Sequence, residues 1–261
     1  MDKSVFFWYT IIVREKQREG RRTGLEERRL TVRRIEITFW VLAALFLALF
    51  SIGEFLRISG KPVFSPVERM GYLLFVCALL YTGGVLRARR TGQGGHMKFL
   101  MFLFAVLYLY LLLTLTLTEE TFGRGDYSNH EDARAYYMKW FVNFRPFRSI
   151  YQVYVKGYRR GYVDRYYVLL NLIGNLCAFL PAAVFLPYFF RLQRRWYIYL
   201  PTVILCVCAV EGLQFWMMVG SCDVDDLILN AGGAFAFWWI LRIPPLRRFL
   251  SRAATGFAKN G

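Results

Sequence analysis

Residues 221–243 read SCDVDDLILNAGGAFAFWWILRI, in which an acidic stretch is followed at once by an apolar run. Another apolar run, of about 20 residues and so long enough to span a bilayer, precedes it. Acidic side chains in or beside a bilayer are costly, so Asp223, Asp225 and Asp226 need a physical explanation. The stretch predicts a helix that enters a membrane from an acidic turn.

The rest of the chain repeats this pattern of long apolar segments. Hydrophobic residues make up 56% of the 261 residues, which exceeds the value of about 45–50% for soluble domains. Six segments are long enough to cross a membrane, at roughly residues 35–56, 68–86, 99–118, 167–190, 196–219 and 227–243. We therefore predict an all-α polytopic membrane helix bundle with about six transmembrane helices.

The distribution of charge predicts the orientation of this bundle. If the chain alternates sides, one side holds residues 1–36, 87–98, 191–195 and the C-terminal tail, and it carries the whole net charge of +16. Lys and Arg accumulate on the cytoplasmic side, so both termini are expected there and the acidic turn outside. The basic run 14–34 contains interleaved glutamates and no aromatic residues. It favours an anchor at anionic lipid head groups over a nucleic-acid arm.

The chain divides into three predicted parts. Residues 1–98 form a basic cytoplasmic arm and two accessory spans, in which Glu54 is expected to be wetted or paired with Arg57. Residues 99–243 form the main transmembrane domain, and residues 244–261 form a basic cytoplasmic tail.

The long outer segment 119–166 is too aromatic for a disordered linker. Ser128 and Glu131 have capping-box spacing, which predicts the start of a short helix. Tyrosines then recur at helical spacing, at Tyr151, Tyr154, Tyr158 and Tyr162. We predict amphipathic interfacial helices here, because a tyrosine ring is apolar while its hydroxyl is polar.

Polar residues interrupt the last three spans at a similar depth. They share helix faces within each span: Asn171 with Asn175, Glu211 with Gln214, and Asp223 with Asp226 and Asn230. We expect one outward-opening polar cleft between these spans, with Arg145 or Arg148 supplying positive charge from the outer loop. Asp225 points elsewhere and is interpreted as a helix cap.

Other interpretations of these residues remain open. An asparagine within a span often only bonds a neighbouring helix, and a carboxylate at a helix start is favourable to the helix dipole. Asp223, Asp226 and Glu211 could hold Mg²⁺, and no other cofactor is indicated. The five cysteines and two histidines show no zinc pattern. A catalytic residue is not identified.

Four segments of the chain resemble the VanZ family. They are VNFRPFRSI (142–150), NLIGNLCAFLPAAVFLP (171–187), EGLQFW (211–216) and DVDDLILNAGGAFAFW (223–238). The resemblance carries site positions to Arg145, Pro146, Phe147, Asn171, Asn175, Pro181, Glu211, Gln214, Asp223, Asp225, Asp226, Asn230 and Gly232. It implies a bacterial plasma-membrane protein of the cell envelope, connected with resistance to the glycopeptide teicoplanin, and no particular reaction.

Three functions fit these observations. The first is binding of a membrane lipid or lipopeptide, such as a lipoglycopeptide or an undecaprenyl-linked envelope precursor, in the outward-facing cleft. The second is a membrane enzyme acting on a lipid-linked phosphate, although no nucleophile is evident. The third is a lipid transporter or flippase, although no internal repeat is found.

Overall fold

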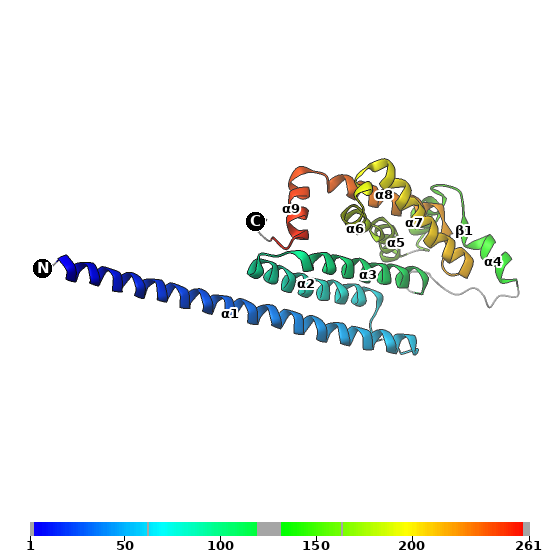
Figure 1. The fold of residues 1–261 in the computed structure, drawn as a ribbon. Helices are drawn as coiled ribbons and strands as arrows, with labels where there is room; N and C mark the ends of the chain where they lie inside the picture. Colours follow the sequence, from blue (N-terminus) through cyan, green and yellow to red (C-terminus); the bar gives the residue numbers. More distant parts are fainter. Residues whose placement is uncertain (1–2, 62, 119–131, 163, 258–261) are drawn as a thin grey trace. The chain divides into compact units, whose positions relative to one another are not determined.

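The computed structural model describes residues 3–61, 63–118, 132–162 and 164–257, with side chains from residue 23 onward except at residues 153, 154 and 167. Its helices are α1 (Lys3–Ile58), α2 (Pro66–Thr91), α3 (Gly95–Leu117), α4 (Ala133–Trp140), α5 (Arg165–Ala178), α6 (Ala182–Phe189), α7 (Trp196–Met217), α8 (Val224–Ile240) and α9 (Pro244–Ala254). Shorter elements are β1 (Val142–Asn143), the π-helical η2 (Ile150–Gly157), the 3₁₀ turn η3 (Arg191–Arg194) and β2 (Cys222–Asp223) (Figure 1).

The predicted all-α membrane bundle is confirmed. Within the described residues, five helices are long and apolar enough to cross a membrane, and the count is up to six if the bent pair α8 and α9 forms one span. The first candidate span is Thr23–Ile58, so the basic arm continues directly into it as one helix. At about 1.5 Å per residue, the 56 residues of α1 extend far beyond a hydrocarbon core of about 30 Å.

Two predicted spans contain a break or a bend that their continuous apolar sequences do not indicate. The fourth consists of α5 and α6, because the helix ends at Ala178 and begins again at Ala182, next to Pro181. Proline cannot donate the backbone hydrogen bond that would continue the earlier helix. The sixth begins at Val224, earlier than expected, and the chain bends by 92° between α8 and α9. The predicted basic tail therefore contains the helix α9.

The chain forms two compact units. Unit 1 comprises residues 1–64, 71–100 and 252–261, and unit 2 comprises residues 65–70 and 101–251.

Unit 1 pairs its buried carboxylates with arginines. Glu54 accepts a hydrogen bond from Arg57 at 2.9 Å, which confirms the expected pair. Glu36, just after the basic run of α1, accepts one from Arg90 of α2 at 2.8 Å. The rings of Phe46 and Phe50 pack on Tyr72, which joins α1 to α2.

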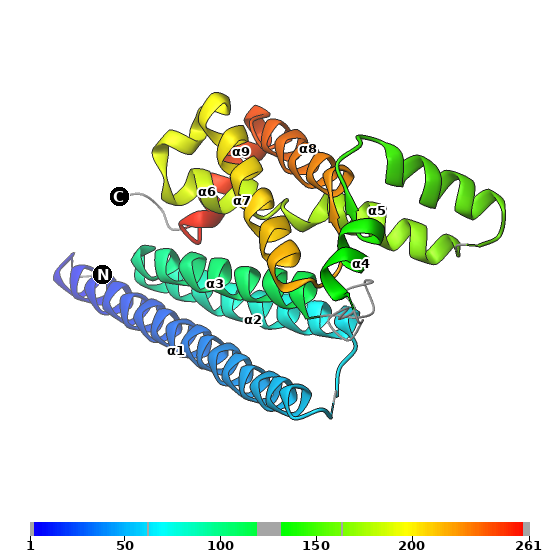
Figure 2. The same ribbon diagram turned by 90° about the vertical axis from the view of Figure 1, so that its right-hand side faces the viewer.

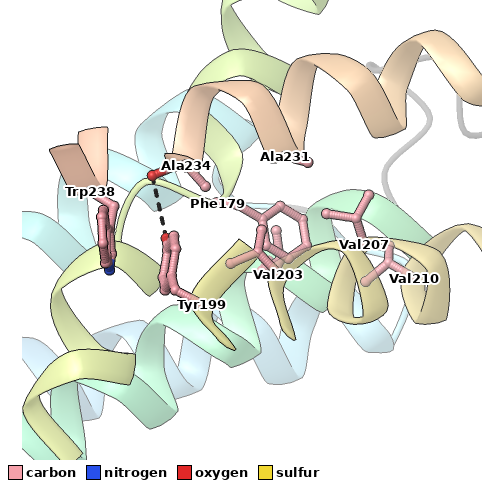
Figure 3. Packing of buried hydrophobic residues seen from close by; sticks show 10 residues of the cluster. Phe179, Tyr199, Val203, Val207, Val210, Ala231, Ala234 and Trp238 are labelled. Atoms are coloured by element: carbon pink, nitrogen blue, oxygen red, sulfur yellow. Dashed lines mark hydrogen bonds between the residues drawn. The ribbon is translucent and has the colours of Figure 1, made fainter. Parts of the chain in front are cut away.

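Unit 2 surrounds a core between α7 and α8, with α5 and α6 beside them (Figure 2). The core consists of Leu112, Phe179, Ala183, Tyr199, Val203, Val207, Val210, Ala231, Ala234 and Trp238. Figure 3 shows Tyr199 donating a hydrogen bond to the Ala234 carbonyl, at 3.3 Å. The Tyr199 ring also stacks on Trp238 at 5.3 Å, so a buried polar group is satisfied inside an aromatic contact.

Within its described residues, the segment 119–166 contains the short helices α4 and η2, as expected. The side chains of Tyr151, Tyr158 and Tyr162 are exposed. The predicted capping box of Ser128 and Glu131 and the side chain of Tyr154 lie outside the described residues.

Candidate functional site: an acid–amide cluster at the start of α8

The site is built where α7 turns into α8. Helix α7 ends with Met218 in the left-handed conformation, at φ 53°, and Gly220 follows at φ 63°. This sharp turn leads into β2, and Asp223 then caps α8 by accepting a hydrogen bond from the Asp225 N–H at 2.9 Å. The acidic motif therefore occupies the first turn of α8, where the positive end of the helix dipole favours carboxylates.

A short parallel pairing brings a distant loop to this turn. Strand β1 pairs with β2, which sets Asn143 opposite Asp223. The Asn143 amide donates to one Asp223 oxygen at 2.9 Å, and the Ser149 hydroxyl donates to the other. The same amide lies 3.1 Å from the Ser149 oxygen, so the loop 143–150 is fixed at both ends.

Asp225 holds the middle of the same loop. Its carboxylate accepts hydrogen bonds from the backbone N–H groups of Phe147, Ser149 (2.9 Å) and Ile150 (3.1 Å). The side chain is only 1% exposed, so these three donors offset the cost of removing a charge from water. They also hold Phe147 in the left-handed conformation, at φ 61°.

The interpretation of Asp225 as the helix cap is wrong, because Asp223 is the capping residue. The side chain of a capping residue accepts a hydrogen bond from a backbone N–H two or three residues later, in the first turn of the helix, and only Asp223 precedes that turn. Asp225 instead points at the loop 143–150, whose position could not be seen from local spacing.

The face formed by Asp226 and Asn230 meets α5. Asp226, 8% exposed, accepts a hydrogen bond from the Asn175 amide, and the Asn230 amide donates to the Asp226 carbonyl at 2.8 Å. The helices approach closely at Gly233, where a Cβ would overlap the Leu176 carbonyl oxygen. Gly174 has open space around it, so the close approach depends on the glycine of α8.

Glu211 joins the cluster from α7. It is half-buried, and its carboxylate accepts a hydrogen bond from the Asp223 N–H at 3.1 Å. Burial raises the pKa of the neighbouring Cys222 thiol to about 11, and the charges of Glu211, Asp223 and Asp226 act in the same direction. The Cys222 thiol is therefore affected both by burial and by the three carboxylates around it.

We call this set the acid–amide cluster; it comprises Asn143, Ser149, Asn175, Glu211, Asp223, Asp225 and Asp226. Asn143 and Ser149 were not predicted as site residues, although both lie in the segment VNFRPFRSI that carried the resemblance. Their role depends on contacts with Asp223, which is 80 residues from Asn143 and 74 residues from Ser149 in the sequence.

Other predicted residues lie around the cluster. Asn171 is half-buried on α5, one turn before Asn175. Gln214 is completely buried and donates to the Thr116 carbonyl of α3 at 2.8 Å, so its amide joins helices. Arg145 and Arg148 are on the loop 143–150 with exposed side chains.

The described residues do not provide a preformed magnesium site. They contain no group of three or more His, Cys, Asp or Glu side chains arranged to hold a metal ion. Both oxygens of Asp223 are occupied by hydrogen-bond donors, as Asn143, Ser149 and Asp225 show.

The fold and the cluster define a polytopic helical membrane protein with an acidic site at the end of two adjacent helices. The family model described as VanZ/LLP1 matches residues 102–245, more than half of the chain, and the chain belongs to this family. The matched region contains the whole acid–amide cluster. No curated protein and no solved structure matches the chain.

Proposed function

We propose that the acid–amide cluster binds the polar head group of an envelope lipid or lipopeptide at the outer face of a bacterial plasma membrane. The observation that carries this proposal is the convergence of acids and amides from α5, α7, α8 and the loop 143–150. Separate structural roles would not require these groups to meet at one place.

The opposite ends of α7 and α8 support the outward orientation. Arg191, Arg194 and Arg195 precede or cap the start of α7, and Arg242 follows the end of α8. Arginines accumulate on the cytoplasmic side of membrane proteins. With the arginines inside, the acid–amide cluster faces the cell exterior.

Burial separates the residues that build the cluster from those available to a ligand. Asp225 is buried and bonded to three backbone donors, so it supports the loop 143–150. Asn175 and Glu211 of the cluster, together with Asn171 one turn earlier on α5, are half-buried and can contact a ligand at the surface of unit 2. These three residues are the binding residues of the proposal.

The chemistry of these groups selects a class of ligand. A carboxylate only accepts hydrogen bonds, whereas an asparagine amide both donates and accepts. The matching head group offers hydroxyl, amide or amine donors, as sugars and peptides do in lipid-linked wall precursors and lipoglycopeptides. The exposed rings of Tyr151, Tyr158 and Tyr162 offer apolar surface for an acyl or prenyl chain.

The test measures susceptibility to teicoplanin and to a lipoglycopeptide in cells expressing wild type, Glu211→Gln, Asn175→Ala or an empty vector. Asp164→Asn is the matched control, because Asp164 is an exposed carboxylate that caps α5. We expect reduced susceptibility with wild type and Asp164→Asn, and vector-like susceptibility with Glu211→Gln. Equal membrane levels of all variants are checked by immunoblot.

Purified protein in nanodiscs separates binding from resistance. Addition of a lipoglycopeptide or an undecaprenyl-linked precursor should raise the melting temperature of wild type and not that of Glu211→Gln. Equal shifts in both proteins would contradict binding at the cluster. Conversion of a labelled lipid-linked phosphate by wild type would instead support the enzymatic alternative.

A further inference from the structure

The end of unit 2 opposite the acid–amide cluster contains a fixed guanidinium group. The Arg242 guanidinium carbon lies 3.3 Å from the centre of the Trp238 ring, and the group donates to the Arg194 carbonyl. The Trp238 indole donates to the Gln193 carbonyl at 3.1 Å, and the Gln193 amide donates to Thr202 at 2.9 Å. Stacking and hydrogen bonding therefore hold Arg242 in one orientation.

Further arginines lie on the two segments that adjoin this group, Arg191 and Arg194 in η3, Arg195 after it, and Arg247 and Arg248 in α9. We call the set the arginine cluster; it comprises Arg191, Arg194, Arg195, Arg242, Arg247 and Arg248. The acidic residues between positions 187 and 251 are Glu211, Asp223, Asp225 and Asp226, and all four belong to the acid–amide cluster. Most of α7 separates the two clusters: Arg195 and Glu211 are 16 residues apart, which is about 24 Å along the helix.

Helix α9 places apolar and basic side chains next to each other at this end. It leaves α8 at a 92° bend, at the pair Pro244 and Pro245. Ile243 and Leu246 are 47% and 38% exposed, and Arg247 follows directly. A helix turned sharply from a membrane span, with apolar and arginine faces, is suited to the bilayer interface.

We propose that the arginine cluster binds the phosphate of an anionic phospholipid, with the acyl chains along the apolar residues at the bend between α8 and α9. Arg242 is the fixed contact, and Arg194 and Arg247 supply further donors and charge. Arginine suits this role because its planar guanidinium pairs with phosphate through two hydrogen bonds. Basic surfaces between spans on the cytoplasmic side recognise anionic head groups in this way.

This site is distinct from the proposed head-group site at the acid–amide cluster. It lies at the other end of α7 and α8, and it selects the opposite ligand charge. If experiments contradict binding at one of these sites, the proposal for the other site is not affected.

The test is native mass spectrometry of the full chain, titrated with phosphatidylglycerol, cardiolipin or phosphatidylcholine. The test variant is Arg194→Gln with Arg247→Gln, which leaves the stacked Arg242 in place. The control is Arg159→Gln with Arg160→Gln, which removes two exposed arginines from the outer segment. We expect anionic lipids to bind about 30-fold more weakly to the test variant, and the control to behave as wild type.

Three results would overturn the proposal. The first is equal retention of anionic lipid by wild type and the test variant. The second is equal retention of phosphatidylcholine and phosphatidylglycerol by wild type. The third is displacement of the lipid by millimolar inorganic phosphate, which would assign the site to free phosphate. Retention that survives phosphate and falls in the test variant supports the lipid site.

Discussion

The two units of the protein hold buried carboxylates in different ways. In unit 1, Glu36 and Glu54 accept hydrogen bonds from the guanidinium groups of Arg90 and Arg57. In unit 2, Asp225 accepts from three backbone N–H groups, and Asp226 accepts from the amide of Asn175. A nearby arginine neutralises the charge of a carboxylate. A neutral N–H donor fixes the position of the carboxylate and does not cancel its charge.

This difference supports placing the proposed site in unit 2. An ion pair satisfies both partners and leaves little field for a ligand. A carboxylate held by amides keeps a negative field, and the charges of Glu211, Asp223 and Asp226 add to burial in raising the pKa of Cys222. Unit 1 thus uses its charges to join helices, while unit 2 concentrates charge at one end of α8.

The largest expected effect comes from Gly233→Ala, because the added Cβ would overlap the Leu176 carbonyl of α5. The shift would separate Asn175 from Asp226 and destabilise unit 2 by about 3 kcal/mol. Gly232→Ala is the matched control, since a Cβ added there would have no neighbouring atom within 4 Å. Thermal unfolding in detergent measures both, and equal melting temperatures would show that the close approach is unimportant.

Asp225→Asn tests the carboxylate held by backbone donors. Asparagine offers one acceptor oxygen, and its NH₂ group would face N–H donors of the loop 143–150. We expect a loss of about 2–3 kcal/mol in stability and faster proteolysis of that loop. Asp164→Asn should cost less than about 0.5 kcal/mol, because this exposed cap retains an acceptor. A stable Asp225→Asn protein would contradict the supporting role of Asp225.

Unit 1 provides the contrasting measurement, a double-mutant cycle of Glu36→Gln and Arg90→Gln. The Arg90 side chain is 27% exposed, so we expect a coupling free energy of about 1 kcal/mol or less. This coupling should weaken as salt is added, because salt screens exposed charges. The loss in Asp225→Asn should change little with salt, and a strong salt dependence would remove the contrast between the units.

The smallest expected effect is on the reactivity of Cys222. Its pKa is raised to about 11, so the thiolate is scarce at neutral pH and alkylation accelerates as the pH rises toward that value. Glu211→Gln removes one of the negative charges that raise this pKa. With the other four cysteines replaced by alanine, maleimide labelling at mildly alkaline pH should become about three- to tenfold faster. An unchanged rate would mean that the charge of Glu211 does not reach Cys222.

The sequence predicted the membrane bundle well because an apolar segment of sufficient length has few other stable environments. Helical spacing also predicted that Asp226 and Asn230 share a face, and the structure brings that face to Asn175. The sequence was less informative about the places where a predicted span is interrupted. The break at Pro181 and the bend after α8 depend on how apolar residues pack after the hydrogen-bond ladder ends.

The sequence by itself thus determined the membrane helix bundle, the family segments and the residues that bring charge to the later spans. The tertiary structure alone decided which carboxylate caps α8, which one holds the loop 143–150 and which arginine meets Glu36. The physical reason is that spacing along a helix defines a face, whereas a hydrogen-bond partner is defined by what reaches that face. For Asp223 and Asp225, the partners come from a loop more than seventy residues earlier in the chain.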